Sequence, residues 1–217
     1  MQTISMKKVS YLLTIAACML GGVAVAQKQS KEWISLFDGK TLNDWKVGDN
    51  AATFRVDSGM IIANGNVAHL FYDGKVNDHN FTNFHFKAEV KTTPGSNSGI
   101  YFHTAFQQGG WPSKGYEVQV NNSHTDWRRT GSLYAIEDVK DVLVKDNEWY
   151  TEEVIVQGKK VTIKVNGKTV VDYTEPDNVK RSGGMEGRVL SSGTFALQGH
   201  DPNSKVYYKN IQVKILP

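Results

Sequence analysis

Cysteine is nearly absent from this sequence, since Cys18 is the single one among 217 residues. It lies inside the one long apolar run, "YLLTIAACMLGGVAVA", which follows Lys7 and Lys8. This layout, closed by the small residues of 24–26, predicts a signal peptide over residues 1–26 that is removed after export. The run is short for a transmembrane helix, and its glycine pair and cleavage pattern argue against one.

Export leaves two expected locations for the remaining chain. The first is the periplasm or the cell exterior. The alternative is an outer-membrane lipoprotein, because residues 15–17 before Cys18 resemble the motif that precedes an acylated cysteine, although the residues after Cys18 stay apolar. Residues 27–217 contain no cysteine and no second long apolar run. We therefore expect one domain without a transmembrane segment, stabilised by its hydrophobic core and not by disulfides.

Neither sign of charge dominates, and helical periodicity is almost missing. Without Lys7 and Lys8 the chain has 23 basic and 22 acidic residues, a balance that gives no reason to expect nucleic acid or an anionic membrane as partner. Short alternating runs, separated by Gly, Asn, Asp and Pro, predict an all-β chain. The predicted strand regions are 53–65, 81–93, 98–106, 115–120, 150–173, 193–200 and 205–216.

Ten or more antiparallel strands of this kind predict a jelly-roll β-sandwich of two antiparallel sheets. The clearest local signal is Asn166-Gly167, the preferred pair for a two-residue hairpin turn. Two stretches without a strand pattern, 64–80 and 121–148, are unusually long for a compact β fold. We expect these stretches to form or to cover a functional site.

Three of the predicted strands each carry two polar side chains, one residue apart, on the face opposite their apolar residues. These side chains are of types that bind ligands or transfer protons. If these strands are neighbours, the pairs lie within reach of one another and favour a binding or catalytic face. Taken alone, Glu117 in "GYEVQVNN" is more simply interpreted as a solvated surface residue. The pairs are Tyr101 with His103, Glu117 with Gln119, and Gln198 with His200.

Three loop residues are further candidates for ligand binding, and each also has a simpler structural interpretation. Trp111 lies in a Gly- and Pro-rich loop and is a candidate for stacking on a sugar ring, or for closing the edge of the sandwich. Arg128 and Arg129 are candidates for binding a polar ligand, or for a salt-bridged surface loop.

Histidines and carboxylates are candidate ligands for a divalent metal, which is the only cofactor that the sequence suggests. The spacing of His69, His79 and His85 does not match metal ligands, and we interpret them as structural or surface residues. Two histidines and a carboxylate from different strands are suitable ligands in type. This candidate set is His103, Glu117 and His200.

Several catalytic motifs are missing. The sequence has no G-x-S-x-G nucleophile elbow and no phosphate-binding loop. A conventional glycosidase needs two facing carboxylates, yet Gln119 stands where a second acid is expected beside Glu117. Glu89 is the remaining distant candidate for that second acid.

Six segments of the chain resemble the 3-keto-disaccharide hydrolase domain family, formerly DUF1080. They are "WISLFDGKTLNDWK", "NSGIYFH", "GYEVQVNN", "TGSLY", "NGKTVVDY" and "GTFALQGHDPNSKVYYKNIQVKIL". One departure is His103, where many members carry arginine. The resemblance implies a concanavalin A-like jelly roll, in an exported bacterial protein, that acts on a 3-keto-glycoside or oligosaccharide.

The resemblance also implies a reaction. A partner sugar 3-oxidoreductase would first convert the C3 hydroxyl of a glycoside to a ketone, which acidifies the C2 proton. Loss of that proton gives an enolate that expels the C1 substituent, and water addition completes a net hydrolysis. Glu117 or a histidine would be the base, and Tyr134 or a histidine would protonate the leaving oxygen. The enolate would be stabilised by the metal set above or by donors. The donors are Gln119, Gln198 and Tyr101.

Two other functions remain open from the residues. One is a lectin-like module that binds carbohydrate without catalysis, and the other is a conventional two-carboxylate glycosidase. Lectin sites rely on aromatic and amide side chains, whereas a carboxylate with two histidines favours acid–base chemistry. The absence of a second acid argues against the conventional glycosidase.

Overall fold

The computed structural model describes residues 32–217. The signal peptide predicted for residues 1–26 and the acylation alternative at Cys18 lie outside these residues. The described part contains two short 3-10 helices, η1 (Ala51–Thr53) and η2 (Val76–His79). No helix in this part is long and apolar enough to cross a membrane.

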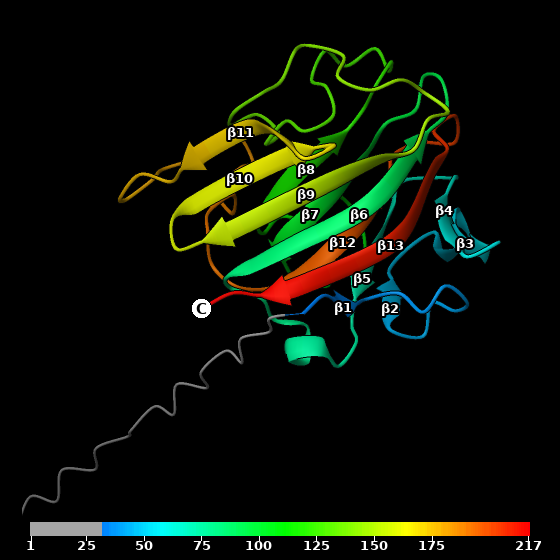
Figure 1. The fold of residues 1–217 in the computed structure, drawn as a ribbon, viewed down its shortest axis with the longest axis horizontal. Helices are drawn as coiled ribbons and strands as arrows, with labels where there is room; N and C mark the ends of the chain where they lie inside the picture. Colours follow the sequence, from blue (N-terminus) through cyan, green and yellow to red (C-terminus); the bar gives the residue numbers. More distant parts are fainter. Residues whose placement is uncertain (1–31) are drawn as a thin grey trace, which may run out of the picture.

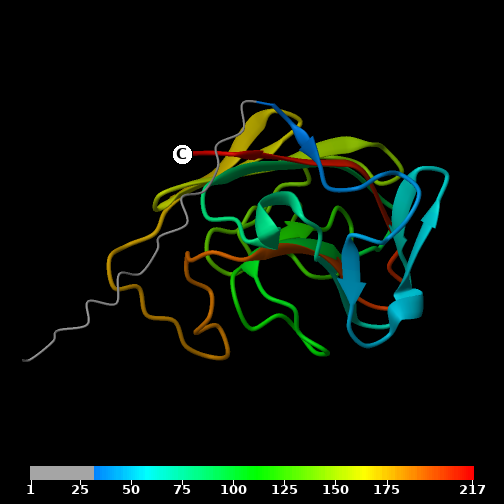
Figure 2. The ribbon, with the colours of Figure 1, turned by 90° about the horizontal axis from the view of Figure 1, so that it is seen from below.

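Two antiparallel sheets pack face to face, as predicted (Figures 1 and 2). The eight-stranded sheet has the order β11-β10-β9-β6-β13-β4-β3, with β1 also paired to β13. Its strands are β1 (Ile34–Ser35), β3 (Phe54–Asp57), β4 (Met60–Ala63), β6 (Phe84–Thr92), β9 (Tyr150–Gln157), β10 (Lys160–Val165), β11 (Lys168–Thr174) and β13 (Val206–Ile215).

The second sheet has five strands in the order β2-β5-β12-β7-β8. These strands are β2 (Trp45–Val47), β5 (Ala68–Tyr72), β7 (Ser98–Thr104), β8 (Tyr116–Val120) and β12 (Thr194–Gly199). In this sheet β12, β7 and β8 are adjacent, so the three strands with polar pairs are indeed neighbours.

The core lies between the sheets and is built by residues that alternate along the strands. On β6, Phe84, Phe86 and the other even-numbered residues are buried, while the odd-numbered ones are only half-buried. Phe86 contacts Phe195 of the opposite sheet, with ring centroids 4.7 Å apart. Burial of such apolar surface is the dominant favourable term in folding, which suits a domain without disulfides.

The hairpin between β10 and β11 follows its sequence signal. Asn166 and Gly167 both have positive φ, 48° and 77°, as a type I′ turn requires. Val165 and Lys168 are paired on either side of this turn. A glycine is used at the second position because it adopts this φ without steric cost.

One stretch expected to be free of strands contains one. Residues 64–80 include β5, whose sequence "AHLFY" is buried at all five positions. A strand covered on both faces loses the polar alternation by which strands are recognised, and this explains why it was missed. The other long stretch, 121–148, has no strand and forms a wall of the pocket described below.

Glu89 was the distant candidate for a second acid, and this prediction is wrong. It lies on the outer face of the eight-stranded sheet, where Lys209 is 3.2 Å away and Asn210 donates to it. The pocket described next lies on the other sheet, so Glu89 cannot face Glu117.

Candidate functional site

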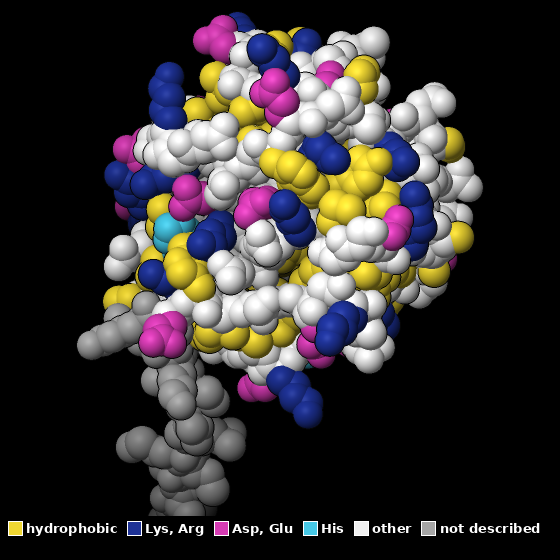
Figure 3. All heavy atoms as spheres, turned by 45° about the vertical axis from the view of Figure 1, so that its right-hand side comes forward, with side chains coloured by type: hydrophobic (Ala, Val, Ile, Leu, Met, Phe, Trp, Pro, Cys, Tyr) yellow, Lys and Arg dark blue, Asp and Glu magenta, His cyan; other side chains and the backbone are white. Residues whose placement is uncertain are grey.

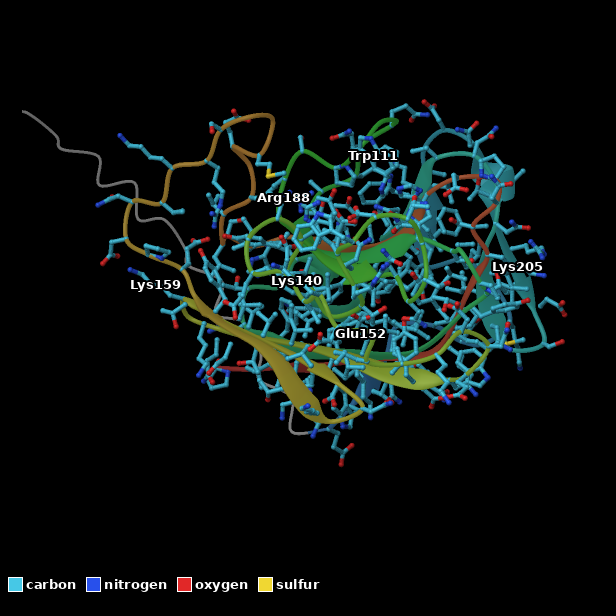
Figure 4. All side chains as sticks on the ribbon, turned by 90° about the horizontal axis from the view of Figure 1, so that it is seen from above. Trp111, Lys140, Glu152, Lys159, Arg188 and Lys205 are labelled. Carbon is cyan, nitrogen blue, oxygen red and sulfur yellow. The ribbon has the colours of Figure 1, made fainter. Side chains whose placement is uncertain are left out.

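A pocket of about 300 Å³ lies on the outer face of the five-stranded sheet. Its floor is made by side chains of the three neighbouring strands, and its walls by the loops that follow β7, β8 and β11. Register places Tyr101 opposite Ala196 on one side and opposite Glu117 on the other. Figure 4 shows Arg188 and Trp111 on the outer side of this sheet. The predicted residues that line the pocket are Tyr101, Trp111, Glu117, Gln119, Tyr134, Gln198 and His200.

Glu117 is buried and not solvated, because the loops cover the sheet face on which it lies. Gln198 donates to its Oε1 at 2.9 Å, and Arg188 donates to its Oε2 at 3.2 Å. Burial raises the pKa of Glu117, while Arg188, the Tyr101 hydroxyl and Gln198 oppose this by stabilising the anion. The carboxylate is therefore held in place from both of its oxygens.

Arg188 was not recognised in the sequence, because the segment that carries it has no strand pattern. Its guanidinium lies 5.9 Å from the ring centroid of Tyr101 and 5.6 Å from that of Tyr134. Nη2 bonds Glu117, whereas Nη1 is buried without a hydrogen-bond partner. An arginine forms planar, directional hydrogen bonds, so Nη1 is a donor fixed in the wall of the pocket.

Two other buried polar atoms near the pocket lack a partner. They are Oε1 of Gln198 and Nε2 of His69. These residues are directly paired between β12 and β5, so their side chains are neighbours on the outer sheet face. Most buried polar groups are hydrogen-bonded, and unsatisfied ones call for an explanation.

His69 was interpreted as a structural or surface residue, and it is buried in the sheet beside two residues that line the pocket. Its ring lies edge-on to Tyr101 at 5.2 Å and to Trp111 at 5.6 Å. Burial lowers the pKa of His69 to about 4, with a further contribution from nearby His200. The neutral ring thus offers an uncharged polar atom beneath the exposed indole of Trp111.

His200 forms a dyad with Asp201 at the rim of the pocket. Nδ1 of His200 lies 2.7 Å from Oδ2 of Asp201. Burial raises the pKa of Asp201, but hydrogen bonds from Ser204 and His200 outweigh it and bring the pKa below its usual value. A carboxylate on Nδ1 orients the ring and leaves the lone pair of a neutral imidazole on Nε2.

His103 does not reach the pocket, so its prediction as a site residue is wrong. It has a φ of 54°, and the pairing of β7 with β12 is irregular between Thr194 and Ala196. This bulge ends the two-residue alternation, since an extra residue re-aims the side chains that follow. The ring packs edge-on to Phe84 of the opposite sheet at 5.6 Å. Burial lowers the pKa of His103 to about 4.

The metal set His103, Glu117 and His200 is therefore not assembled. Both ring nitrogens of His103 are committed to backbone groups, of Thr82 at 2.9 Å and Ser191 at 3.2 Å. Within residues 32–217, His124, His200 and Asp201 have ligand atoms within 4.8 Å of one another. Their hydrogen bonds account for the cluster, because Nδ1 of His124 accepts from the backbone N–H of Asp126 at 3.1 Å and Asp201 holds His200. These bonds use Nδ1 of each histidine, and they leave Nε2 of both rings outside them.

The loop after β8 brings one predicted and one unpredicted residue to the pocket. The backbone N–H of Tyr134 donates to the carbonyl of Glu117 at 2.9 Å, which fixes Tyr134 beside the carboxylate. Burial raises the pKa of the Tyr134 hydroxyl, which stays protonated at neutral pH. Asp126 also lines the pocket and supplies a second carboxylate that strand patterns could not reveal.

Arg128 and Arg129 organise this loop and do not line the pocket. The Nε of Arg128 donates to Asp138 at 3.2 Å, in agreement with a salt-bridged loop. Its guanidinium also lies over the rings of Trp127 and Tyr134, at 4.7 Å from each centroid. Nη1 of Arg129 donates to the backbone carbonyls of His124 and Asp126. The prediction that they bind ligand directly is not supported by this geometry.

These features define a class of protein, a two-sheet jelly roll with a polar pocket on one outer sheet face, an architecture shared with lectins. A family model described as the 3-keto-alpha-glucoside-1,2-lyase-like domain matches residues 32–214. The chain belongs to this family, as the sequence resemblance indicated.

Similar proteins agree with this assignment. A 3-keto-disaccharide hydrolase of Bacteroides thetaiotaomicron is 28% identical over 168 residues, which cover 65% of this chain and 58% of that protein. The chain thus aligns with little more than half of that relative. A crystal structure of a candidate glycosyl hydrolase from Parabacteroides distasonis has a TM-score of 0.71 at 23% identity, covering 85% of this chain and 94% of that one.

The same fold also occurs in a carbohydrate-binding module. A carbohydrate-binding module of Bacillus subtilis has a TM-score of 0.57 at 12% identity, and the match covers 79% of this chain and 95% of the module. At this identity the likeness concerns the fold alone. Function must therefore be argued from the site.

Proposed function

We propose that this protein is an exported enzyme that cleaves 3-keto-glycosides by elimination of the C1 substituent, followed by hydration. The observation that carries the proposal is the buried Glu117–Arg188 pair, which leaves Nη1 of Arg188 as an unpartnered donor in the pocket wall. An enolate oxygen is a suitable acceptor for such a preorganised donor. The family description and the name of the Bacteroides relative support the same substrate class.

His200 is the proposed base. Asp201 on Nδ1 leaves a lone pair on Nε2, which takes the proton from C2 of the keto-sugar. The electron pair of the C2–H bond moves into a C2–C3 double bond, and the ketone oxygen becomes the enolate oxygen that Arg188 stabilises. Glu117 positions Arg188 and balances its charge. This assigns the carboxylate a supporting role and not that of the base.

Tyr134 is the proposed acid. The enolate collapses to a ketone, a C1–C2 double bond forms, and the bond between C1 and the leaving oxygen breaks. The protonated hydroxyl of Tyr134, fixed beside Glu117, delivers its proton to that oxygen. Water then adds at C1 and gives up a proton to the Tyr134 phenolate, while C2 regains a proton from His200. An oxidoreductase acting on the C3 hydroxyl must supply the substrate.

The test compares a 3-keto-glucoside that carries a chromogenic aglycone with its unoxidised parent, each with and without a chelator. We expect aglycone release from the keto form alone, unchanged by chelator, with deuterium from solvent entering C2. His200→Gln should abolish this deuterium entry but keep substrate binding. Glu117→Gln should lower the rate through the loss of Arg188 positioning, and full activity in that variant would refute the assignment.

A conventional glycosidase is the second candidate, because Asp126 places a second carboxylate in the pocket with Glu117. Two carboxylates are the usual requirement for hydrolysis of an unmodified glycosidic bond. Equal cleavage of the keto form and its parent, abolished by Asp126→Asn, would favour this function. Binding of either sugar without any cleavage would instead identify a lectin-like module.

A further inference from the structure

Lysines are concentrated on the outer face of the eight-stranded sheet, which lies on the opposite side of the molecule from the pocket. In Figure 3 basic and hydrophobic side chains are interleaved over part of the surface. Lys205 and Lys214 mark the ends of the lysine stripe along β13. At about 3.4 Å per residue this stripe is roughly 30 Å long. Its lysines are Lys87, Lys91, Lys205, Lys209 and Lys214.

The ammonium groups of this stripe are held over aromatic rings. Lys87 and Lys214 lie 4.0 and 4.9 Å from the ring centroid of Trp33. Lys209 and Lys91 lie 4.2 and 5.0 Å from that of Trp149. Lysine stems cover apolar surface while their charged ends stay in water. The lysine side chains are therefore half-buried, and their ammonium groups are ordered over the rings.

Two carboxylates lie among these lysines, and both are already engaged. Glu89 accepts from Asn210 at 2.6 Å and pairs with Lys209. Glu153 lies 2.7 Å from Nε2 of His85. Ion pairs between described residues involve Lys209 but none of the other four lysines of the stripe. These four form no close ion pair within residues 32–217, although Lys87 is near enough to Glu89 to lower its pKa.

This concentration is local, because the described part as a whole has slightly more acidic than basic residues. Four of the 25 basic residues precede residue 32, which leaves 21 against 22 acidic residues. A stripe of five lysines with two engaged glutamates is a marked departure from that balance. A row of like charges is complementary to a linear polyanion.

We propose that this face binds an acidic polysaccharide, whose repeated carboxylate or sulfate groups pair with the lysine stripe. The tryptophan rings favour an acidic polysaccharide over nucleic acid, a membrane or a neutral sugar, because lysine side chains already cover the faces of these rings. Nucleic acid bases need free ring faces for stacking, and membrane binding needs apolar side chains free to insert. Neutral sugars would also require a free ring. The inference goes beyond the proposed function, since this surface is separate from the pocket.

The experiment measures binding of the protein to polygalacturonate, with a neutral glucan for comparison, by affinity electrophoresis at low and high salt. We expect binding to polygalacturonate alone, weakened at least about tenfold by high salt, because exposed charges are screened. The triple variant K87Q/K91Q/K214Q should bind at least about tenfold more weakly, with three fewer charges facing the polymer. If this variant does not fold, the double variant K91Q/K205Q serves the same purpose.

A matched control removes three exposed lysines from other parts of the surface. The control variant is K40Q/K75Q/K168Q. It has the same net charge as the triple face variant and should bind as the unchanged protein does. Equal weakening in both variants would overturn the proposal, as would an absence of binding to polygalacturonate. Tighter binding to phosphatidylglycerol vesicles or to single-stranded DNA would assign the face to another partner and also overturn it.

Discussion

Glu117 shows how little a residue's place in a strand says about its surroundings. Its position in "GYEVQVNN" correctly places it on the face away from the core. However, the segment carrying Arg188 and the loop carrying Tyr134 cover that face, and the side chain of Glu117 is only 6% exposed. The residue is therefore both outward-facing and buried, and its charge depends on a partner 71 residues away.

The pairing of Glu117 with Arg188 leads to a stability prediction. Arg188→Met leaves a carboxylate buried without its cation, and should lower the free energy of unfolding by about 3 kcal/mol. The double variant E117Q/R188M removes both charges and should recover most of this stability, measured by urea unfolding, while remaining inactive on the 3-keto-glucoside. A single variant as stable as the unchanged protein would contradict a buried ion pair at this site.

At the scale of elements, the segment between β11 and β12 determines where Arg188 lies. Arg181 anchors this segment by donating to the hydroxyls of Tyr116 and Tyr173, both at 2.9 Å. Its other anchor is Gly187, whose carbonyl accepts from the N–H of Gly115 at 2.9 Å. The segment is thus fastened at two points that precede Arg188, whose guanidinium enters the pocket.

Gly187 offers a test of this arrangement. A Cβ at this position would lie 1.9 Å from the carbonyl oxygen of Ser113, so Gly187→Ala must displace the segment next to Arg188. A misplacement of about 1 Å can cost roughly 100-fold in rate. We expect kcat/KM on the 3-keto-glucoside to fall at least tenfold, while Glu186→Ala, an exposed neighbour, retains activity. Unchanged kinetics in the glycine variant would show that the position of this segment is unimportant.

At the scale of the whole molecule, Glu152 lies between the two sheets (Figure 4). It is fully buried; Oε1 accepts from the N–H of Gly131 at 3.1 Å, and Oε2 has no partner. Burial raises the pKa of Glu152 well above its usual value, outweighing the hydrogen bond from Gly131. The folded protein therefore retains a proton that the unfolded chain releases.

This difference predicts how stability changes with pH. Above pH 4.3, about the pKa of glutamate in an unfolded chain, the unfolded state loses its proton first, so the contribution of Glu152 to stability falls as pH rises. Glu152→Gln keeps the acceptor for Gly131 and does not titrate. Its stability relative to the unchanged protein should rise by up to about 1.4 kcal/mol per pH unit. Urea unfolding between pH 4.5 and 8 measures this. A pH-independent difference, as expected for the exposed control Glu148→Gln, would contradict it.

The fold class and the floor of the site could be predicted from the sequence. A period of two along β6, β7 and β8 depends on local backbone geometry, so Tyr101, Glu117 and Gln119 could be assigned to one face. Alternation failed where a strand is buried on both faces, as in β5, and where a bulge turns His103 away. Both failures arise from tertiary contacts that a periodic pattern does not contain.

The sequence by itself determined the two-sheet architecture, the family and the near balance of charge, because these depend on composition, periodicity and local motifs. Only the tertiary structure brought Arg188 and Asp126 to the pocket and His69 next to Trp111, since contacts between distant segments place them there. It alone also aligned the lysines of the outer sheet face, because the register between β6 and β13 sets Lys91 beside Tyr207 and Lys87 beside Gln212. A balanced charge in the chain thus became an uneven charge on the surface.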